Sequence, residues 1–248
     1  MVSSEVSRDT TALLLRRGGA EVVMVEYNVS TGRATGLRKS MKRQWPNLAG
    51  FAVDSQQQRA YFLTSSSVGM ELHSFAFTDS EITALHSMHG EGLRLANAAN
   101  ESVFNVWNVA PWESRGSLLA LSPNGGDVFN MSILTINTTS GLVTVLGQLR
   151  GRPTKGIFAM DSRNERYFFT INQARNRVLV VTHLAEGTFQ MANLADDDAV
   201  DLVALHFDEE GCRLVAVLAR EFGTLETFEV VIPRPGDAEE KPTRLEKL

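Results

Sequence analysis

Three stretches of the chain repeat one pattern: GFAVDSQQQRAYFLTS (50–65), GIFAMDSRNERYFFTI (156–171) and ALHFDEEGCRLVAVLA (204–219). In each stretch an apolar run ends in Asp, and an Arg follows five positions later. The pairs are Asp54 with Arg59, Asp161 with Arg166, and Asp208 with Arg213. An Asp side chain starts a tight turn by accepting hydrogen bonds from the backbone after it, and the β-favouring run behind the Arg is typical of a returning strand. Each copy therefore predicts a strand, a tight turn and a second strand.

A second hairpin follows each copy, with a Gly or Glu to anchor its turn. The anchors are Gly32, Glu81, Gly141, Gly187 and Gly236, at spacings of 49, 60, 46 and 49 residues. The missing third copy of the Asp/Arg pair is expected within NVWNVAPWESRGSLLALS (105–122), where Asn108 stands about midway between Asp54 and Asp161. A period of about 40 to 50 residues with four β-rich segments per unit is typical of a propeller blade. Five units then fill the chain.

The units resemble blades of the β-propeller superfamily, especially degenerate blades whose inner strand ends in Asp. The resemblance covers residues 11–248 and is WD-repeat-like and lactonase-like only in general character, because neither a Gly-His and Trp-Asp pair nor a double glycine recurs. It implies an all-β fold, one propeller domain over 1–248 and no particular activity. A β-sandwich is the alternative. The expected four-stranded blades are 1–40, 48–88, 103–149, 156–194 and 200–248.

We name the strands of a blade A (inner) to D (outer). Thr11–Arg16 is interpreted as the B strand of the first blade, which leaves the polar residues 1–9 for its A strand, and Thr243–Leu248 as the last D strand. We expect a complete ring with one frayed strand; the alternative is an imperfect seam that a partner covers by strand addition. The best helix candidate is EGLRLANAAN (91–100).

Composition narrows the class of protein. Of the 248 residues 43% are hydrophobic, which predicts a folded chain. The 24 Lys+Arg and 29 Asp+Glu give a net charge of -5, which predicts no general attraction for nucleic acid or anionic membrane. The single cysteine, Cys212, cannot form an internal disulfide. Neither a signal peptide nor a membrane-spanning run is recognised, so we expect a cytoplasmic protein. Of four glycosylation sequons, those at Asn28 and Asn137 are better explained as turns.

Binding residues are expected on one rim of the channel, where the D-to-A connections and the B-to-C turns meet. The connections in the sequence are 40–47, 88–91 with its continuation, 149–155 and 195–201. Two are basic, one carries histidines and one is acidic. The candidate residues are Lys42, Arg43, Trp45, His89, Arg152, Lys155, Asp197 and Asp198.

Each candidate has a plainer alternative. The basic connections can grip an anionic ligand or acidic peptide with Trp45 as an aromatic anchor, or they are solvated loops whose Trp caps the core. The acidic run supplies oxygen donors for a hard cation, but the pattern of a calcium loop is absent and a solvated charge run is commoner. His86 and His89 have no third ligand nearby for zinc, and nothing supports Cys212 as a nucleophile. The sequence therefore predicts no catalytic residue, no metal site and no cofactor.

These observations favour a non-enzymatic interaction module that binds a protein or peptide on the rim of its channel, with its oligomeric state left open. The alternative is a propeller-type hydrolase of the lactonase or glycosidase kind, possibly metal-dependent, which needs converging carboxylates or a metal with an open position. A lectin is disfavoured, because aromatic residues do not recur in register across the units.

Overall fold

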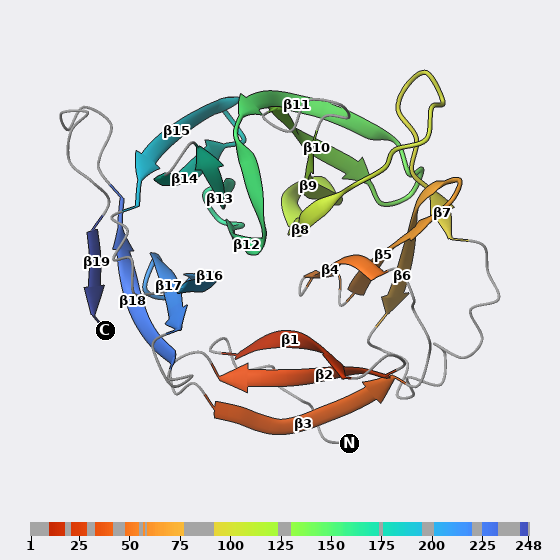
Figure 1. Ribbon diagram of the computed structural model, residues 1–248. Coiled ribbons are helices and arrows are strands. Elements are labelled where there is room, and N and C mark those ends of the chain that lie inside the picture. Colours follow the sequence, from red (N-terminus) through yellow and green to blue (C-terminus); the bar gives the residue numbers. More distant parts are fainter. Residues whose placement is uncertain are drawn as a thin grey trace.

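The computed structural model describes residues 10–17, 21–28, 33–41, 48–54, 57, 59–76, 92–123, 130–173, 176–194, 201–219, 225–232 and 244–247. Its strands form five antiparallel sheets arranged around a ring, with the first strand of each sheet facing the middle (Figure 1). The predicted all-β propeller is confirmed, and the sandwich alternative is wrong because the sheets follow one another around the ring. The domain limits and the count of five complete blades stay predictions, since the first sheet has three strands among the described residues.

The sheets use the chain in order. The first holds β1 (Thr10–Arg17), β2 (Glu21–Asn28) and β3 (Arg33–Met41). The second holds β4 (Leu48–Asp54), β5 (Arg59–Ser66), β6 (Gly69–Ala76) and β7 (Leu93–Arg94). The third holds β8 (Trp107–Trp112), the 3-10 turn η3 (Glu113–Arg115), β9 (Ser117–Pro123), β10 (Asn130–Asn137) and β11 (Val143–Arg150). The fourth holds β12 (Arg152–Asp161), β13 (Arg166–Gln173), β14 (Asn176–His183) and β15 (Thr188–Asn193). The fifth holds β16 (Asp201–Asp208), β17 (Arg213–Ala219), β18 (Leu225–Val231) and β19 (Arg244–Lys247).

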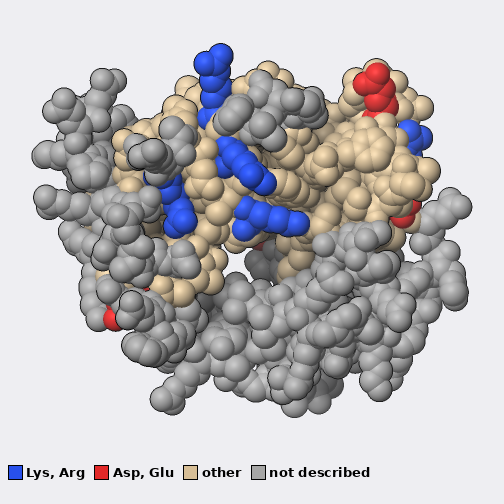
Figure 2. Space-filling model, in the orientation of Figure 1, with Lys and Arg blue, Asp and Glu red and all other residues tan. Residues whose placement is uncertain are grey.

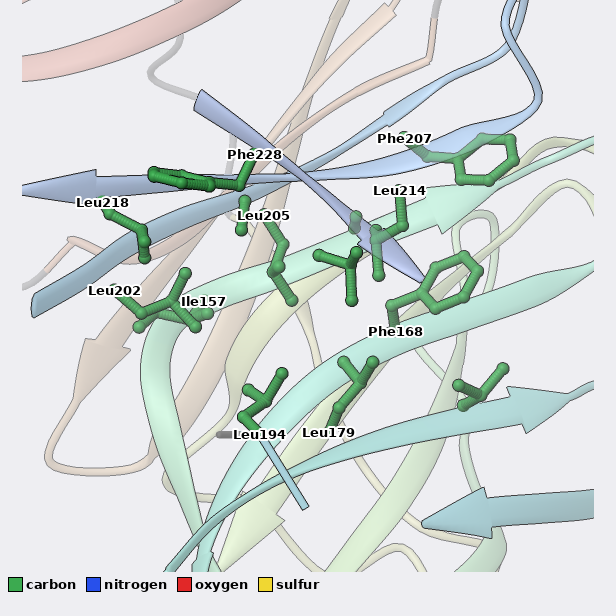
Figure 3. Packing of buried hydrophobic residues seen from close by; sticks show 14 residues of the cluster. Ile157, Phe168, Leu179, Leu194, Leu202, Leu205, Phe207, Leu214, Leu218 and Phe228 are labelled. Atoms are coloured by element: carbon green, nitrogen blue, oxygen red, sulfur yellow. The ribbon is translucent and has the colours of Figure 1, made fainter. Parts of the chain in front are cut away.

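The core lies between neighbouring sheets. One apolar cluster joins the fourth and fifth sheets, where Phe168 of β13 and Phe207 of β16 stack with ring centroids 5.6 Å apart (Figure 3). Two further clusters join the second sheet to the third and the third to the fourth. Burying a side chain such as Phe168 contributes about 1.5–3 kcal/mol. Because each sheet buries its faces against the next, these blades stabilise one another.

The three Asp/Arg turns form as the sequence predicts. Asp54 pairs with Arg59, Asp161 with Arg166 and Asp208 with Arg213, each at the junction of an inner strand with its neighbour. We call these the Asp–Arg turns. In every copy the first Asp oxygen accepts a backbone N–H, from Gln57, Asn164 and Gly211, at 2.7, 2.9 and 3.0 Å. The repeat is therefore a repeated turn chemistry.

The third sheet keeps the turn and changes its residues. Trp112 pairs with Ser117, five positions later, in the place that Asp and Arg hold elsewhere. Asn108 lies four residues before that turn, inside β8, and serves a different purpose described below. The expectation that the third copy lies within 105–122 is confirmed, but neither member of the pair is retained.

The two ends of the ring are partly as predicted. The interpretation of Thr11–Arg16 as the B strand stays a prediction: β1 pairs with β2 and is the innermost described strand of its sheet, but the A strand expected inside it falls on residues 1–9. The preceding residues 1–9 lie outside the described part. The last outer strand, predicted at Thr243–Leu248, is confirmed as β19, which pairs with β18.

The helix expected over 91–100 is wrong where the chain is described, from Gly92 onward. Leu93 and Arg94 form β7, and Ala96 makes β-bridges to Ser102 and Leu142. Leu95 is fully buried in the cluster between the second and third sheets. Tertiary packing of the leucines therefore overrides the helix-favouring composition. No described residue belongs to a helix long and apolar enough to cross a membrane.

Candidate functional site

The two faces of the ring differ in chemistry. The Asp–Arg turns and the Trp112–Ser117 turn join A strands to B strands, so we call their side the A–B face. The opposite side, the D–A face, carries the starts of the inner strands and the β5–β6 turn between Ser66 and Gly69. Two adjoining pockets open among the starts of β4, β8 and β12, on the D–A face.

The outer of these, the mouth pocket, has a volume of about 410 Å³. Its polar lining comes from Ser65 and Ser66 at the end of β5, from Asn105 and from Lys155. Its other lining residues are Ala49, Met70, Val106 and Trp107. An apolar and aromatic wall with a few convergent polar groups is the usual make-up of a ligand pocket.

The inner one, the channel pocket, has a volume of about 310 Å³ and shares Ala49 and Lys155 with the mouth pocket. Each of three successive inner strands contributes a pair of further residues to it: Gly50 and Phe51, Asn108 and Val109, and Gly156 and Phe158. A side chain bound in the mouth pocket would therefore have apolar space beneath it.

A bulge in β12 shapes both pockets. The pairing of β12 with β13 is regular at Pro153 and again at Phe158, and it shifts register between them. Such a bulge leaves backbone groups unpaired and redirects side chains. Asn108 satisfies two of those groups, since its Nδ2 donates to the Thr154 carbonyl at 2.9 Å and its Oδ1 accepts from Gly156 N–H at 2.7 Å. Lys155 lies between these two anchored positions, at the boundary of the two pockets.

Close approach of β4 to β8 closes the other side. A Cβ atom on Gly50 would lie 2.7 Å from Cγ2 of Val109, a distance that real contacts do not reach. Glycine therefore allows the second and third sheets to meet at the channel pocket.

Trp107 and Lys155 meet across the mouth pocket. The Lys155 ammonium lies 5.7 Å from the centroid of the Trp107 ring, within the range of a cation–π contact. Trp112 is buried in a core cluster. Trp107 is half-buried and lines the mouth pocket.

Two exposed apolar side chains lie close to this pocket. Val68, 63% exposed, is in the β5–β6 turn, and Phe104, 48% exposed, precedes β8. The hydrogen bond from Met70 N–H to the Val103 carbonyl, 3.0 Å, brings their two segments side by side. Together they extend the apolar surface beyond the pocket itself.

Arg152 and Lys155 lie in a strand, although the sequence predicts a loop over 149–155. Strand β11 continues to Arg150 and β12 begins at Arg152, so Gly151, with φ +137°, is the whole connection. Both side chains are exposed, and only Lys155 lines the pockets. The other candidates lie outside the described residues: Lys42, Arg43, Trp45, His89, Asp197 and Asp198.

The perturbed carboxylates that the structure describes lie on the A–B face. Hydrogen bonds from Ser114 and from Trp112 Nε1 (3.1 Å) hold the pKa of Glu165 below its usual value. Burial raises the pKa of Glu209, which accepts a hydrogen bond from Ser162 N–H at 3.0 Å. These contacts join the third sheet to the fourth and the fourth to the fifth, so both carboxylates have a structural role.

Groups that would support metal or nucleophilic chemistry are dispersed in the described part of the chain. No cluster of three or more His, Cys, Asp or Glu residues suited to a metal occurs among the described residues. His73 lies within β6, and its Nε2 is 3.1 Å from Thr64 Oγ1. Cys212 is exposed in its Asp–Arg turn, with Sγ 3.6 Å from the Glu209 carbonyl.

Sequence reasoning finds Lys155 and misses most of the pocket around it. Ser65, Asn105 and Trp107 come from different connections and strands, and no local motif links them. A usable signal is present in Asn105 and Asn108, because Asn tolerates positive φ better than most residues and both adopt it, at 57° and 52°. Two such asparagines so close together indicate irregular backbone at a strand start.

Solved propellers share this fold. Nidogen in the nidogen/laminin complex aligns with a TM-score of 0.60 and 14% identity, covering 89% of this chain and 73% of that one. The major Malassezia sympodialis allergen Mala s 1 aligns with a TM-score of 0.51 and 12% identity, covering 97% and 75%. TolB from Acinetobacter baumannii gives 0.47 and 11%, and the chain spans 57% of its length.

The chain is thus a β-propeller protein in its architecture. At these identities the likeness shows the fold alone. No protein-family model matches the sequence, and no curated protein matches it.

Proposed function

We propose that this chain is a non-enzymatic binding module whose protein or peptide ligand docks on the D–A face, with one side chain in the mouth pocket. The observation that carries the proposal is the pair of adjoining pockets that share Ala49 and Lys155. Three successive sheets contribute to them, so the site belongs to the ring rather than to a single loop.

The size and lining of the mouth pocket suit an anchoring side chain. A volume of about 410 Å³ lies at the lower end of the range for small-molecule pockets, about 300–1,000 Å³. Trp107 offers an aromatic wall, and the exposed Val68 and Phe104 continue the apolar surface outward. Peptide recognition commonly combines a buried anchor of this kind with contacts along a groove.

The walls of the site are held in place before any ligand arrives. Asn108 fixes the bulge that carries Lys155, and the Met70–Val103 hydrogen bond fixes the segments that carry Val68 and Phe104. A preorganised site loses less conformational entropy on binding, which favours affinity. Rigid support is therefore consistent with recognition as the purpose of this face.

Selection from a random peptide library tests the proposal. We expect the purified chain to enrich peptides that bind saturably, and Trp107→Ala to weaken a selected peptide at least tenfold in fluorescence anisotropy, as expected for a hot-spot aromatic. The matched control is Phe189→Ala, an exposed aromatic 43% accessible on the outer strand β15, which should leave the affinity unchanged.

Two results would contradict the proposed binding site. If no peptide binds saturably while the chain releases product from a panel of lactones and aryl glycosides, the binding module is wrong and the hydrolase alternative replaces it. Peptide binding that Phe189→Ala weakens and Trp107→Ala does not would place the site elsewhere.

A further inference from the structure

We infer that the ligand of this face is an acidic segment of a protein, with carboxylates bound by Arg152 and Arg177 and an apolar residue in the mouth pocket. This inference rests on the proposed function and specifies its partner. It begins from the register of the fourth sheet, where Asn172 of β13 pairs with Arg152 on one side and with Arg177 on the other. The two arginines therefore flank one residue, in a single row across β12, β13 and β14.

This row is unneutralised within the described part of the chain. No described carboxylate forms an ion pair with Arg152 or Arg177, and Nε of Arg177 is buried without a hydrogen-bond partner. The Nε–H of Arg177 has therefore lost solvation without recovering it in a hydrogen bond. The carboxylate of a ligand can act as the counter-ion and bind the part of the Arg177 guanidinium that stays accessible.

Two arginines of the A–B face, Arg166 and Arg213, show the contrast, whereas Arg59 in the remaining Asp–Arg turn donates to Ser74 Oγ instead. Arg166 lies 2.5 Å from the Asp161 carboxylate and Arg213 lies 2.8 Å from that of Asp208. The chain thus provides internal acids for those cations on one face and leaves Arg152 and Arg177 open among the described residues of the other. In Figure 2 some of the described Lys and Arg side chains lie about the middle of the ring near β12–β14 and others lie at its outer edge, where most of the described Asp and Glu side chains in view also lie.

Lys155 connects this row to the mouth pocket. It follows Arg152 by three residues in β12 and lines both pockets while its ammonium contacts Trp107. A ligand anchored beside Trp107 would therefore have cations along its path as it runs toward β14. Successive residues of an extended chain advance about 3.3 Å. We therefore expect the acids that meet the arginines to lie a few residues from the anchoring residue.

The chemistry favours carboxylates on a peptide over a nucleic-acid backbone. Arginine binds a carboxylate with two parallel N–H donors, and pairs of this kind fix geometry as well as charge. The channel pocket that adjoins the mouth pocket also supplies an apolar subsite, as an acidic peptide with one hydrophobic anchor requires.

Three labelled decapeptides test the inference. They share a central Phe-Leu anchor and differ in four flanking residues, which are all Glu, all Gln or all Lys. By fluorescence anisotropy we expect the Glu peptide to bind at least tenfold more tightly than the Gln peptide and the Lys peptide to bind most weakly. Raising the salt concentration from 50 to 300 mM should remove most of the difference between the Glu and Gln peptides, because salt screens exposed charges.

Variants of Arg152 and Arg177 test whether these two residues cause the preference for the Glu peptide. Arg152→Gln and Arg177→Gln should each weaken the Glu peptide three- to tenfold and leave the Gln peptide unchanged. Arg177→Lys keeps the charge without the fork and should recover only part of the loss. Arg163→Gln, the same change at an exposed arginine in the turn of the A–B face, should have no effect. Thermal unfolding of each variant checks that the fold is intact.

The outcomes separate the two proposals. Equal binding of the Glu and Gln peptides overturns this inference and leaves the proposed binding module standing. If no decapeptide and no library peptide binds, the proposed function fails and this inference fails with it. If a ten-nucleotide oligothymidylate binds as tightly as the Glu peptide and shows the same dependence on Arg152 and Arg177, the site recognises polyanions in general and the acidic-peptide reading is wrong.

Discussion

Asn108 and Gly156 join the third sheet to the fourth through a 2.7 Å hydrogen bond from the Gly156 backbone N–H to the Asn108 side-chain oxygen. The same side chain donates to the Thr154 carbonyl, and the Asn108 carbonyl accepts the hydroxyl of the fully buried Tyr167. Asn108 is itself buried, with φ +52°. One residue thus supports the bulge that presents Lys155 and the packing beneath it.

Replacing Asn108 by Ala should lower the free energy of unfolding by about 1–2 kcal/mol, because the partly buried backbone groups of Thr154 and Gly156 lose their side-chain partner. Asn100→Ala is the matched control, since Asn100 has φ +60° but is exposed, and its hydrogen bonds to Asn97 and Arg94 are made by its backbone N–H and carbonyl. Urea unfolding measures both. A loss of the same size in both variants would show that backbone strain, rather than the hydrogen bonds, accounts for the effect.

The Asp–Arg turns should differ in their contribution to stability. Asp161 is fully buried and holds both Asn164 and Arg166, whereas the Asp208 side chain is 24% exposed. Breaking a buried pair costs about 3–5 kcal/mol and an exposed one up to about 1 kcal/mol. Asp161→Ala should therefore destabilise the chain several-fold more than Asp208→Ala in urea unfolding. Equal losses would contradict the role assigned to burial.

The sequence predicts these turns because their signal is local: an Asp, the backbone just after it and an Arg five positions later. It does not predict that Trp112 and Ser117 occupy the same positions, because Trp112 gains its partner from Glu165, in the next sheet. The mouth pocket is missed for the same reason, as its residues converge from β5, β8 and β12. Leu95 reads as helical and is instead fixed by burial against the third sheet.

Gly50→Ala should destabilise the junction of the second and third sheets. The new methyl group would lie 2.7 Å from Val109 Cγ2, and overpacking of this kind costs about 1–3 kcal/mol. Removing the obstacle in Gly50→Ala/Val109→Ala should cost less than the sum of the single changes. Gly147→Ala is the control, since a Cβ there meets nothing within 4 Å. Strict additivity of the free energies would contradict the proposed contact.

Acid titration should distinguish Asp208 from Glu209. The Gly211 N–H, and then Arg213, hold the pKa of Asp208 below its ordinary 3.8, so its stabilising contribution is present above pH 3.8 and is lost as the pH falls through the lower folded value. The stability gap between the wild type and Asp208→Asn should narrow below pH 4. A gap independent of pH between 2 and 6 would contradict this linkage.

The contribution of Glu209 to stability should depend on pH in the opposite direction to that of Asp208. Burial raises its pKa above 4.5, so its favourable contribution is present below pH 4.5 and is lost as the pH rises through the folded value. Glu209→Gln should therefore gain stability relative to the wild type between pH 4 and 7, because the amide can still accept the Ser162 hydrogen bond. Urea unfolding across this range measures the difference, and a relative loss of stability with rising pH would contradict it.

Cys212→Gly should stabilise the chain. Cys212 has φ +50°, a left-handed conformation that costs an ordinary residue about 1–2 kcal/mol, and glycine adopts it freely. The greater freedom of glycine in the unfolded chain offsets part of that gain, which leaves about 0.5–1 kcal/mol.

Glu165 also has φ +50°, in the equivalent turn of the fourth sheet, but it accepts hydrogen bonds from Trp112 and Ser114. Glu165→Gly should therefore destabilise the chain, and thermal unfolding of the two variants should give shifts of opposite sign. Shifts of the same sign would mean that either the backbone strain at Cys212 or the link between sheets at Glu165 is absent in solution.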